Sequence, residues 1–500
     1  MHLIEKHHIE ARCNQKEFGH HMKDEIAAVF EFQLYPELER LLDRYDNPLG
    51  VYEIELLPVE ISLVATKNWR EELVRQSLSQ IENFLLENAL HGVGETEDVS
   101  QNKGIKNYDK YIFVQDLFLH YLKTGQLSVN PLSDTLDDIF EWLEFPDSFI
   151  QKLIEFVPED IDRVLRWNFN IPKDLKKRFL SFSEGSISID SLESLQNEWE
   201  EIYSKSAEKQ PQLKEPSEFT GFIEFLFWIS VFISENTTIE AISEEKMLLI
   251  AKDYFQLSQE DLVLLLNTLM ELESAKKTHG LVALIERVLN QEKKIGKDVY
   301  LKEKKAPTEI NKIDAVLDAI EQANNEKVVS KNNAAVYINN AGLVLIHPFL
   351  VTLFQKLNYL DDTVWKSKKL QHRAVLIVQY LVNFEEHIFE SDLLVGKIFC
   401  GVPLLDSVSV KWKITPEEDT KCRELLQSVV EHWSILKNTS VKALQETFIQ
   451  RKGKLVEYKE DTYEITVEQQ SIDLLLDQLP WGIGTIKTPW MENYLSCYWN

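Results

Sequence analysis

Hydrophobic and polar positions follow a clear helical period in the last third of the chain. Seven apolar residues keep the i, i+3, i+4, i+7 spacing over four turns, which predicts an amphipathic helix: Cys422, Leu425, Leu426, Val429, Val430, Trp433 and Leu436. Thr415-Pro416-Glu417-Glu418 precedes this run and matches a capping box with proline at the first helical position. A helix that begins at Pro416 is therefore expected.

Three shorter elements are expected around residues 441–479. Val441, Leu444 and Phe448 predict a helix that ends at Arg451-Lys452-Gly453, where cations and glycine favour a C-terminus. Residues 456–458 and 463–467 alternate in polarity and predict a β-hairpin. Ser471 is expected to cap a last helix, which carries Ile472, Leu475, Leu476 and Leu479.

The first 95 residues have the pattern of a small α/β unit. We expect a short strand over Leu3–Arg12 and a helix over Glu17–Tyr45, bent at Pro36 because proline lacks a backbone donor. Residues 51–56 alternate with the strand period. From Trp69 the period becomes helical, with one apolar face formed by Val74, Leu78, Ile81 and Leu85.

The middle of the chain is mostly helical by pattern, with polar breaks. Residues 91–107 are expected to be a loop, and Tyr111–Leu122 a helix that ends at Thr124-Gly125. A break near 204–218 precedes Phe219–Ile233, an apolar run too short to cross a bilayer and therefore expected to be a buried core helix.

Helices are also expected over 244–289 and, briefly, over 309–324. Between them, residues 291–305 are rich in lysine and are expected to be a linker. No heptad pattern and no internal repeat of 20–50 residues occurs. These patterns predict an α+β, helix-dominated, multi-domain chain with small antiparallel β elements near both ends and no long coiled coil.

Four domains are expected from these breaks. They are an N-terminal α/β unit (1–95), an acidic helical region (96–215), a second helical region with the lysine-rich linker (216–330) and a C-terminal α+β domain (331–500).

Charge narrows the possible partners. The net charge is −28, with −25 on residues 1–330 and −3 on residues 331–500. This excess of carboxylates argues against binding to nucleic acid or to anionic membranes. The N-terminus has no apolar signal-peptide core. The cysteines Cys13, Cys400, Cys422 and Cys497 form no CxxC pair, as expected for reduced, mostly buried thiols of a cytosolic protein.

Candidate chemistry is sparse. No Walker A loop, GxGxxG, HExxH, GxSxG or EF-hand motif occurs. His7-His8 and His20-His21 lie near carboxylates, but their spacing is not that of a zinc site, and solvated positions are the simpler interpretation. Glu385-Glu386-His387 is interpreted as an exposed loop or helix edge. We therefore expect no catalytic residue, no cofactor and no metal.

Two short motifs have a structural and an interaction interpretation. His347-Pro348 is typical of a helix N-terminus with proline at the first position, and contact of His347 with a partner is the alternative. Arg451 and Lys452 either complete a helix end or bind a carboxylate on a partner.

The best candidates for protein contact lie near the C-terminus. Pro480-Trp481 and Pro489-Trp490 are nine residues apart, and Met491 and Trp499 follow. Tryptophan is enriched in interface hot spots, but indoles also complete domain cores, so both interpretations stay open.

Six motifs in one order give the chain a family resemblance. They are NAGLVLIHPFL (340–350), FCGVP (399–403), HW with LKNTS (432–440), FIQRKGKL (448–455), LPWGI (479–483) and PWM (489–491). Together they resemble the contractile injection system tape measure proteins, which are components of phage-tail-like particles. The resemblance implies a non-enzymatic role in assembly and partners among the inner tube, hub, spike or baseplate proteins.

The expected function is structural, through control of tube and sheath length or nucleation of assembly. A baseplate- or cap-associated assembly factor is the alternative, and an enzyme or toxin cargo is disfavoured by the missing catalytic motifs. A phage-type ruler is an extended helix that rises about 1.5 Å per residue. The 16 glycines, 15 prolines and strand patterns of this chain interrupt such a helix. We therefore expect folded domains, assembled in the cytoplasm without membrane insertion.

Overall fold

The structure is a computed structural model and describes most of the chain. The described residues are 2–4, 7–46, 50–62, 67–89, 105–128, 130–133, 135–182, 189–207, 216–234, 242–278, 280–303, 335–459 and 462–499. They form two compact units. Unit 1 comprises Met1–Phe118 and Val129–Glu144, and unit 2 comprises Leu119–Ser128 and Phe145–Asn500. The four-domain division stays a prediction, and its last boundary near 330 lies outside the described residues.

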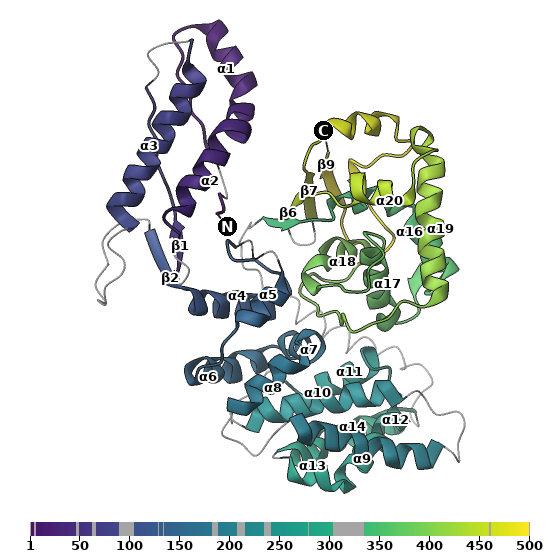
Figure 1. The fold of residues 1–500 in the computed structure, drawn as a ribbon. Coiled ribbons are helices and arrows are strands. Elements are labelled where there is room, and N and C mark those ends of the chain that lie inside the picture. The colour runs from purple at the N-terminus through teal and green to yellow at the C-terminus, as the bar shows by residue number, and fades with distance from the viewer. Residues whose placement is uncertain are drawn as a thin grey trace. The chain divides into compact units, whose positions relative to one another are not determined.

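Unit 1 is built on the helices α1 (Lys16–Val29), α2 (Tyr35–Asp43) and α3 (Trp69–Ala89) (Figure 1). The helix expected over 17–45 is confirmed, but a π-helical turn (η1, Phe30–Leu34) interrupts it just before Pro36, whose missing N–H removes an ordinary helical bond. Two small apolar clusters hold these helices together. They consist of Met22, Val29, Trp69 and Leu73, and of Leu38, Leu41, Ile81 and Leu85.

The strand β1 (Gly50–Ile54) confirms the strand expected from residue 51 and pairs antiparallel with β2 (Ile105–Asp109). The loop expected over 91–107 is wrong at its end, because β2 begins at Ile105 although its sequence is mostly polar. The strand expected over Leu3–Arg12 is wrong, because the described residues of this stretch form no strand and pair with none. Unit 1 also contains α5 (Leu136–Trp142), whose N-cap is Thr135.

The helical region of unit 2 is centred on one almost wholly apolar helix, α10 (Pro216–Ser234). The buried core helix expected over 219–233 is therefore confirmed, and Phe222, Phe225, Leu226 and Trp228 have no exposed surface. A helix that is apolar all round must be covered on every side. α7, α9 and α14 supply that cover (Figure 1).

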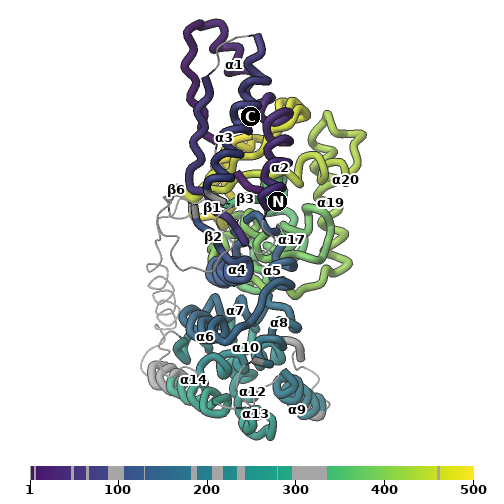
Figure 2. The backbone as a smooth tube through the Cα atoms, turned by 60° about the vertical axis from the view of Figure 1, so that its left-hand side comes forward, coloured from purple at the N-terminus to yellow at the C-terminus, as the bar shows by residue number. Residues whose placement is uncertain are grey.

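The other helices of this region follow in chain order. They are α4 (Lys110–Thr124, shared with unit 1), α6 (Asp147–Phe156), the 3-10 turn η2 (Val157–Glu159), α7 (Ile161–Asn170), α8 (Lys173–Phe182), α9 (Ile189–Ala207), α11 (Glu244–Asp253), α12 (Gln259–Glu271), α13 (Glu273–Lys277) and α14 (Leu281–Glu303). α12, α13 and α14 lie side by side (Figure 2).

Several predictions for this region can be compared with the helices. α4 ends as expected at Gly125, whose φ of 72° suits glycine. The linker expected over the lysine-rich residues 291–305 is wrong for residues 291–303, because α14 extends to Glu303. The break expected over 204–218 is narrower, since α9 runs to Ala207 and α10 begins at Pro216. The short helix expected at 309–324 lies outside the described residues.

The C-terminal domain, residues 335–499, contains a five-stranded sheet in the order β3-β6-β7-β9-β8. Its strands are β3 (Val336–Ile338), β6 (Gly453–Lys459), β7 (Thr462–Val467), β8 (Thr485–Ile486) and β9 (Leu495–Tyr498). The expected hairpin is confirmed as β6–β7, and β7 pairs in parallel with β9. A second pair, β4 (Leu360–Asp361) and β5 (Val364–Trp365), is antiparallel.

Helices cover this sheet and complete the domain core. They are η3 (Ala341–Phe349), α16 (Leu350–Lys356), α17 (Lys368–Tyr380), η4 (Glu390–Leu393), α18 (Leu394–Cys400), α19 (Pro416–His432), η5 (Ser434–Leu436), α20 (Val441–Leu444), η6 (Gln445–Ile449) and η7 (Ser471–Gln478). The elements marked η in this domain are 3-10 helices, except for η6, which is π-helical like η1. The expected α+β, helix-dominated class with small sheets near both ends is confirmed.

The capping box of α19 is confirmed in both directions. The Glu418 N–H donates to Thr415 Oγ1 at 3.2 Å, and the Thr415 N–H donates to Glu418 Oε2 at 2.7 Å. Two N–H groups that have no helical partner are thereby satisfied. The predicted apolar face of α19 is buried through Cys422, Leu425, Leu426, Val429 and Val430.

Three predicted helix ends in this domain are wrong. His347-Pro348 lies inside η3, and α16 begins later, at Leu350. Gly453 is not a helix cap but the first residue of β6. The last helix is a 3-10 helix whose capping residue is Gln470, not Ser471.

Candidate protein-contact site

Trp481 closes one side of the C-terminal core. Its Nε1–H donates to the Leu345 carbonyl at 3.0 Å, and its ring packs edge-on against Phe349 with centroids 5.2 Å apart. In a 3-10 helix that carbonyl would accept from the residue three positions later, which is Pro348 and has no N–H. The indole therefore replaces a backbone bond that proline removes, and it links two motifs 136 residues apart.

Trp490 is held by different partners. Its Nε1–H donates to the Thr363 carbonyl at 2.8 Å, and its ring lies 4.5 Å from the ring of Trp365 and 5.6 Å from that of Phe354. Trp481 and Trp490 are each half-buried. Each indole thus has one face in the core and some surface left for solvent.

The remaining candidates differ in exposure. Pro480 and Pro489 are exposed, whereas Met491 and Trp499 are buried. Trp499 Nε1–H donates to Asp473 Oδ2 at 3.1 Å. The surface that these six residues offer to a partner therefore comes mainly from the two prolines and the outer edges of Trp481 and Trp490.

Arg451 is part of the same packing and not of a free surface. Its guanidinium is buried and pairs with Asp473, and it lies 5.5 Å from the centroid of the Trp499 ring. Arg451 therefore binds a carboxylate, but this carboxylate is Asp473 of the same chain and not a group on a partner. The His347 Nδ1–H donates to the Val344 carbonyl at 2.8 Å, and burial lowers the pKa of its imidazole.

An exposed apolar surface adjoins Trp481, and the sequence pattern did not predict it. Leu474 is 77% exposed, and no residue of η7 is buried although four of its eight residues are aliphatic. A 3-10 helix has three residues per turn. Leu476 therefore follows Asp473 on the inner side, while Leu474 shares the outer side with Ser471 and Asp477. The 3.6-residue period of an α-helix would have predicted a different buried face.

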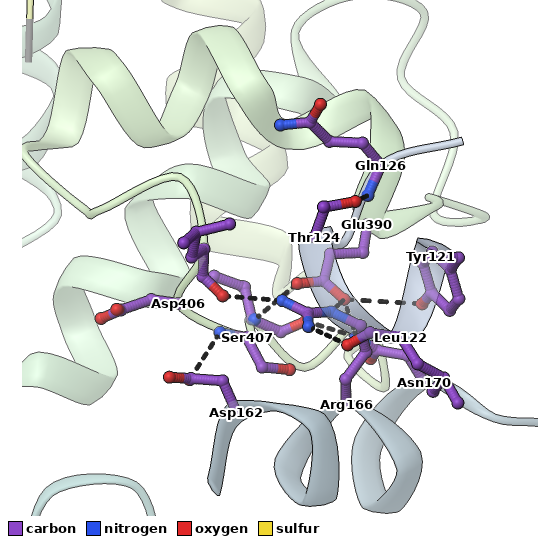
Figure 3. A network of polar contacts seen from close by, with 12 residues as sticks. Tyr121, Leu122, Thr124, Gln126, Asp162, Arg166, Asn170, Glu390, Asp406 and Ser407 are labelled. Carbon is purple, nitrogen blue, oxygen red and sulfur yellow. Dashed lines mark hydrogen bonds and ion pairs between the residues drawn. The ribbon is translucent and has the colours of Figure 1, made fainter. Parts of the chain in front are cut away.

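A buried ionic cluster joins the helical region to the C-terminal domain (Figure 3). The carboxylate of Glu390 accepts from Arg166 Nε at 2.9 Å, from Asn170 Nδ2 at 2.7 Å and from Lys397 Nζ at 3.2 Å. Arg166, Glu390 and Lys397 have no exposed side-chain surface. Tyr121 from α4 also donates to Glu390, at 3.5 Å.

The cluster is satisfied by backbone groups as well. Arg166 donates to the carbonyls of Leu122 at 2.6 Å and Leu405 at 2.7 Å. Burial alone would raise the pKa of Glu390, but the charges of Arg166 and Lys397 outweigh burial and lower it. Removing one member of a buried ion pair typically costs about 3–5 kcal/mol, because the other charge is left unpaired.

A second carboxylate at this junction, that of Asp162, has a raised pKa, whereas the pKa of Glu390 is lowered. Asp162, in the first turn of α7, accepts from the Ser407 N–H at 3.3 Å (Figure 3). Burial, followed by the nearby charges of Asp406 and Asp160, raises the pKa of Asp162 to about 7. The junction therefore contains a carboxyl group that changes charge near neutral pH.

The other candidate clusters are dispersed. Glu385, Glu386 and His387 are exposed, as expected. Cys13 is exposed and Cys400, Cys422 and Cys497 are buried, all as free thiols. Within the described ranges, no three His, Cys, Asp or Glu side chains are grouped to hold a metal ion. Nor does any described helix have the length and apolarity needed to span a bilayer.

Comparison with known proteins gives the family. The family model described as contractile injection system tape measure protein matches residues 1–499, so the chain belongs to this family. The match extends the resemblance carried by residues 336–499 over the front of the chain. No curated protein and no solved structure gives a significant match. The protein is therefore a structural component of a phage-tail-like contractile particle.

Proposed function

We propose that this protein acts in its particle as a folded assembly component and not as a single extended helix. It sets tube and sheath length, or nucleates their assembly, through fixed contact surfaces that bind the inner tube, the hub or spike, or the baseplate. The candidate contact residues Pro480, Trp481, Pro489, Trp490, Met491 and Trp499 belong to this proposal. The assembly takes place in the cytoplasm, and the role of this protein in it involves no catalysis, nucleic acid or membrane insertion.

The observation that carries the proposal is the buried cluster around Glu390. Arg166 and Glu390 are 224 residues apart in sequence, and their side chains have no exposed surface. An extended chain would separate them and leave both charges without these partners. Because burial of paired charges is favourable only with complete partners, this cluster supports a chain that works while folded.

The lengths of the helices support the same proposal. The longest described helix is α14, with 23 residues, which corresponds to about 35 Å. Within each unit the described helices pack against one another, and turns, strands or 3-10 and π-helical segments divide them, as where η1 interrupts the run from Lys16 to Asp43. A ruler built from one helix requires continuity that these described segments do not have.

The test is zero-length cross-linking of the protein in assembled particles. Lys369 Nζ lies 2.6 Å from Glu218 Oε1, and this exposed pair joins the C-terminal domain to α10. A carbodiimide condenses such pairs into an amide. In a continuous helix the two residues, 151 positions apart, would lie about 230 Å from each other.

We expect mass spectrometry to find the Lys369–Glu218 cross-link in particles and in the purified chain alike. Lys421 and Glu424, 2.9 Å apart within α19, serve as the control for reagent access. A particle sample with the control cross-link and without the Lys369–Glu218 cross-link would refute the folded form.

The alternative within the same particle is a factor confined to the baseplate or cap. Gold or density labels on the C-terminus, viewed by electron microscopy, distinguish label at one end of the particle from label along the tube. Neighbouring genes for sheath, tube and baseplate proteins are expected in either case.

A further inference from the structure

Exposed and half-buried apolar residues of η5, η7 and the Pro480-Trp481 pair lie near one another in the C-terminal domain. We define the Leu474 surface by six residues: Ile435, Ile472, Leu474, Leu475, Pro480 and Trp481. η5, which carries Ile435, contacts η7. Phe349 touches the ring of Trp481 at 5.2 Å and that of His432 at 5.7 Å, and His432 directly precedes Trp433 and η5. The six residues therefore lie around one area of the domain surface.

The exposure of this surface is not explained by the packing of the domain itself. Ile472 is 40% exposed, Leu474 77% and Ile435 38%. Ile472 and Leu474 do not pack against the domain core, whereas their neighbours Leu475 and Leu476 do so in part. Single exposed aliphatic residues are common, but several adjoining ones typically mark an interaction site.

Charges at the rim indicate the chemistry of the partner. Residues 468–486 contain three carboxylates and no lysine or arginine. Asp473 is paired with Arg451, whereas Asp477 is exposed on the same side of η7 as Leu474. Glu468 before η7 is also exposed, and the exposed Lys452 lies next to it, since the Lys452 carbonyl accepts from the Glu468 N–H at 2.9 Å. Glu431 at the end of α19 adds a carboxylate, and Lys437 after η5 is an exposed cation nearby.

This rim disfavours two possible occupants. A second copy of this chain, with net charge −28, would place acidic rims against each other. An anionic lipid surface would be repelled for the same reason. A protein with an apolar centre and a basic border is complementary both in charge and in polarity.

We propose that the Leu474 surface binds a component of the particle whose own apolar patch is bordered by lysine and arginine. This inference rests on the proposed function, because it assigns one of the fixed contact surfaces of the folded chain. It places the contact on η7 and the outer edge of Trp481, and the buried Trp499 supports η7 from within through its bond to Asp473.

The test compares full-length variants expressed in the particle-producing host. Leu474→Gln removes the apolar centre, and Leu56→Gln is the matched control because Leu56 is 75% exposed in unit 1. Both variants should keep the thermal unfolding midpoint of the parent chain. Leu474→Gln should lower the amount of this protein in purified particles by about tenfold, a typical loss for one central contact, and Leu56→Gln should not.

A charge-reversal variant tests whether the border of the partner's apolar patch is basic. Asp477→Lys should lower incorporation further, since the partner's border is basic, whereas an acidic border would make it rise. A photoreactive amino acid at position 474 should cross-link to a tube, hub or baseplate component. Cross-linking to a second copy of this chain, or unchanged incorporation of Leu474→Gln, would overturn the assignment.

The two proposals can fail separately. If Leu474→Gln incorporates normally while the Lys369–Glu218 cross-link persists in particles, only the Leu474 surface is refuted. If that cross-link is missing from particles of the parent chain, the folded form fails first.

Discussion

At the scale of single residues, the motifs of the C-terminal domain are explained by close packing. A Cβ on Gly342 would lie 1.7 Å from the Phe448 carbonyl oxygen, so η3 and η6 approach too closely for any side chain. Trp481 in turn bonds the carbonyl that Pro348 leaves without its 3-10 donor. Residues from three of the six motifs thus meet in one core.

We therefore expect Gly342→Ala to destabilise the protein by more than about 3 kcal/mol, because backbone atoms must move to admit the methyl group. The control is Gly482→Ala, where an added Cβ meets nothing within 4 Å. That variant should stay within about 0.5 kcal/mol of the parent. Chemical denaturation measures both, and equal losses would contradict the packing explanation.

The raised pKa of Asp162 makes the free energy of unfolding depend on pH. Its pKa is about 7 in the folded chain and 3.8 ordinarily. Between these values the folded state keeps a proton that the unfolded state releases, so stability falls as pH rises from about 4 to above 7. Asp162→Asn cannot ionise and still accepts from the Ser407 N–H. It should be more stable than the parent at pH 8, with an advantage that shrinks towards pH 5.

Urea denaturation of parent and variant at pH 5, 6, 7 and 8 measures this difference. Asp361→Asn, at an exposed carboxylate, is the control and should show no such trend. A constant difference between Asp162→Asn and the parent at every pH would show that Asp162 does not titrate in this range.

At the scale of elements, local chemistry determines where α19 begins. Thr415→Ala removes the side-chain acceptor of the Glu418 N–H and should cost about 1 kcal/mol. Thr420→Ala in the same helix is the control, since the Thr420 hydroxyl only donates back to the Pro416 carbonyl, and alanine is the better helix former. Thermal unfolding of the two variants measures the difference. Equal effects would show that the cap does not stabilise α19.

The elements that could be predicted are those fixed by neighbouring residues. The capping box at Thr415, the hairpin β6–β7 and the apolar helix α10 depend on spacing within a few turns. η7 was expected as a helix, but its 3-10 form was not, because its apolar residues also fit a 3.6-residue period. β2 was missed because its pairing with β1 spans more than 50 residues.

The candidate site was predictable only in part, for a similar reason. The two Pro-Trp pairs could be identified from the sequence because tryptophan is rare and large. The carboxylate of Glu390 is one of 82 acidic side chains, and nothing near it in sequence indicates Arg166 as its partner. The exposure of Leu474 likewise depends on the helix type. Contacts between distant segments determine these features.

At the scale of the whole molecule, the C-terminal domain has its own apolar core. Every residue of that core cluster lies between Val336 and Trp499, and none comes from the helical region. A fragment of residues 331–500 should therefore be soluble and unfold cooperatively. It should also be less stable than the domain in the full chain, because Glu390 loses its hydrogen bonds from Arg166 and Asn170.

Differential scanning calorimetry of the fragment measures this, and Glu390→Gln with Lys397→Met in the fragment is the informative comparison. In the fragment this remaining pair is open to water, so replacing it should cost less than the about 3–5 kcal/mol expected for Glu390→Gln in the full chain, where the buried Arg166 and Lys397 lose their carboxylate. A fragment that is molten or aggregated would show that the domain needs the helical region to fold.

Particle length provides the last test of a folded component against a literal ruler. Deleting residues 244–289, which contain α11, α12, α13 and the first part of α14, is expected to reduce particle yield or broaden the lengths, because Leu265, Leu266 and Ile285 belong to a buried helical core. A cleaner variant deletes residues 306–330, which removes no residue of the described helices or strands. A continuous helix would shorten the particle by about 38 Å for these 25 residues, at 1.5 Å each. A folded component keeps its contact surfaces, so the mean length measured by electron microscopy should stay the same. A narrow distribution shifted by the full helical length would establish the ruler and defeat the folded-component proposal.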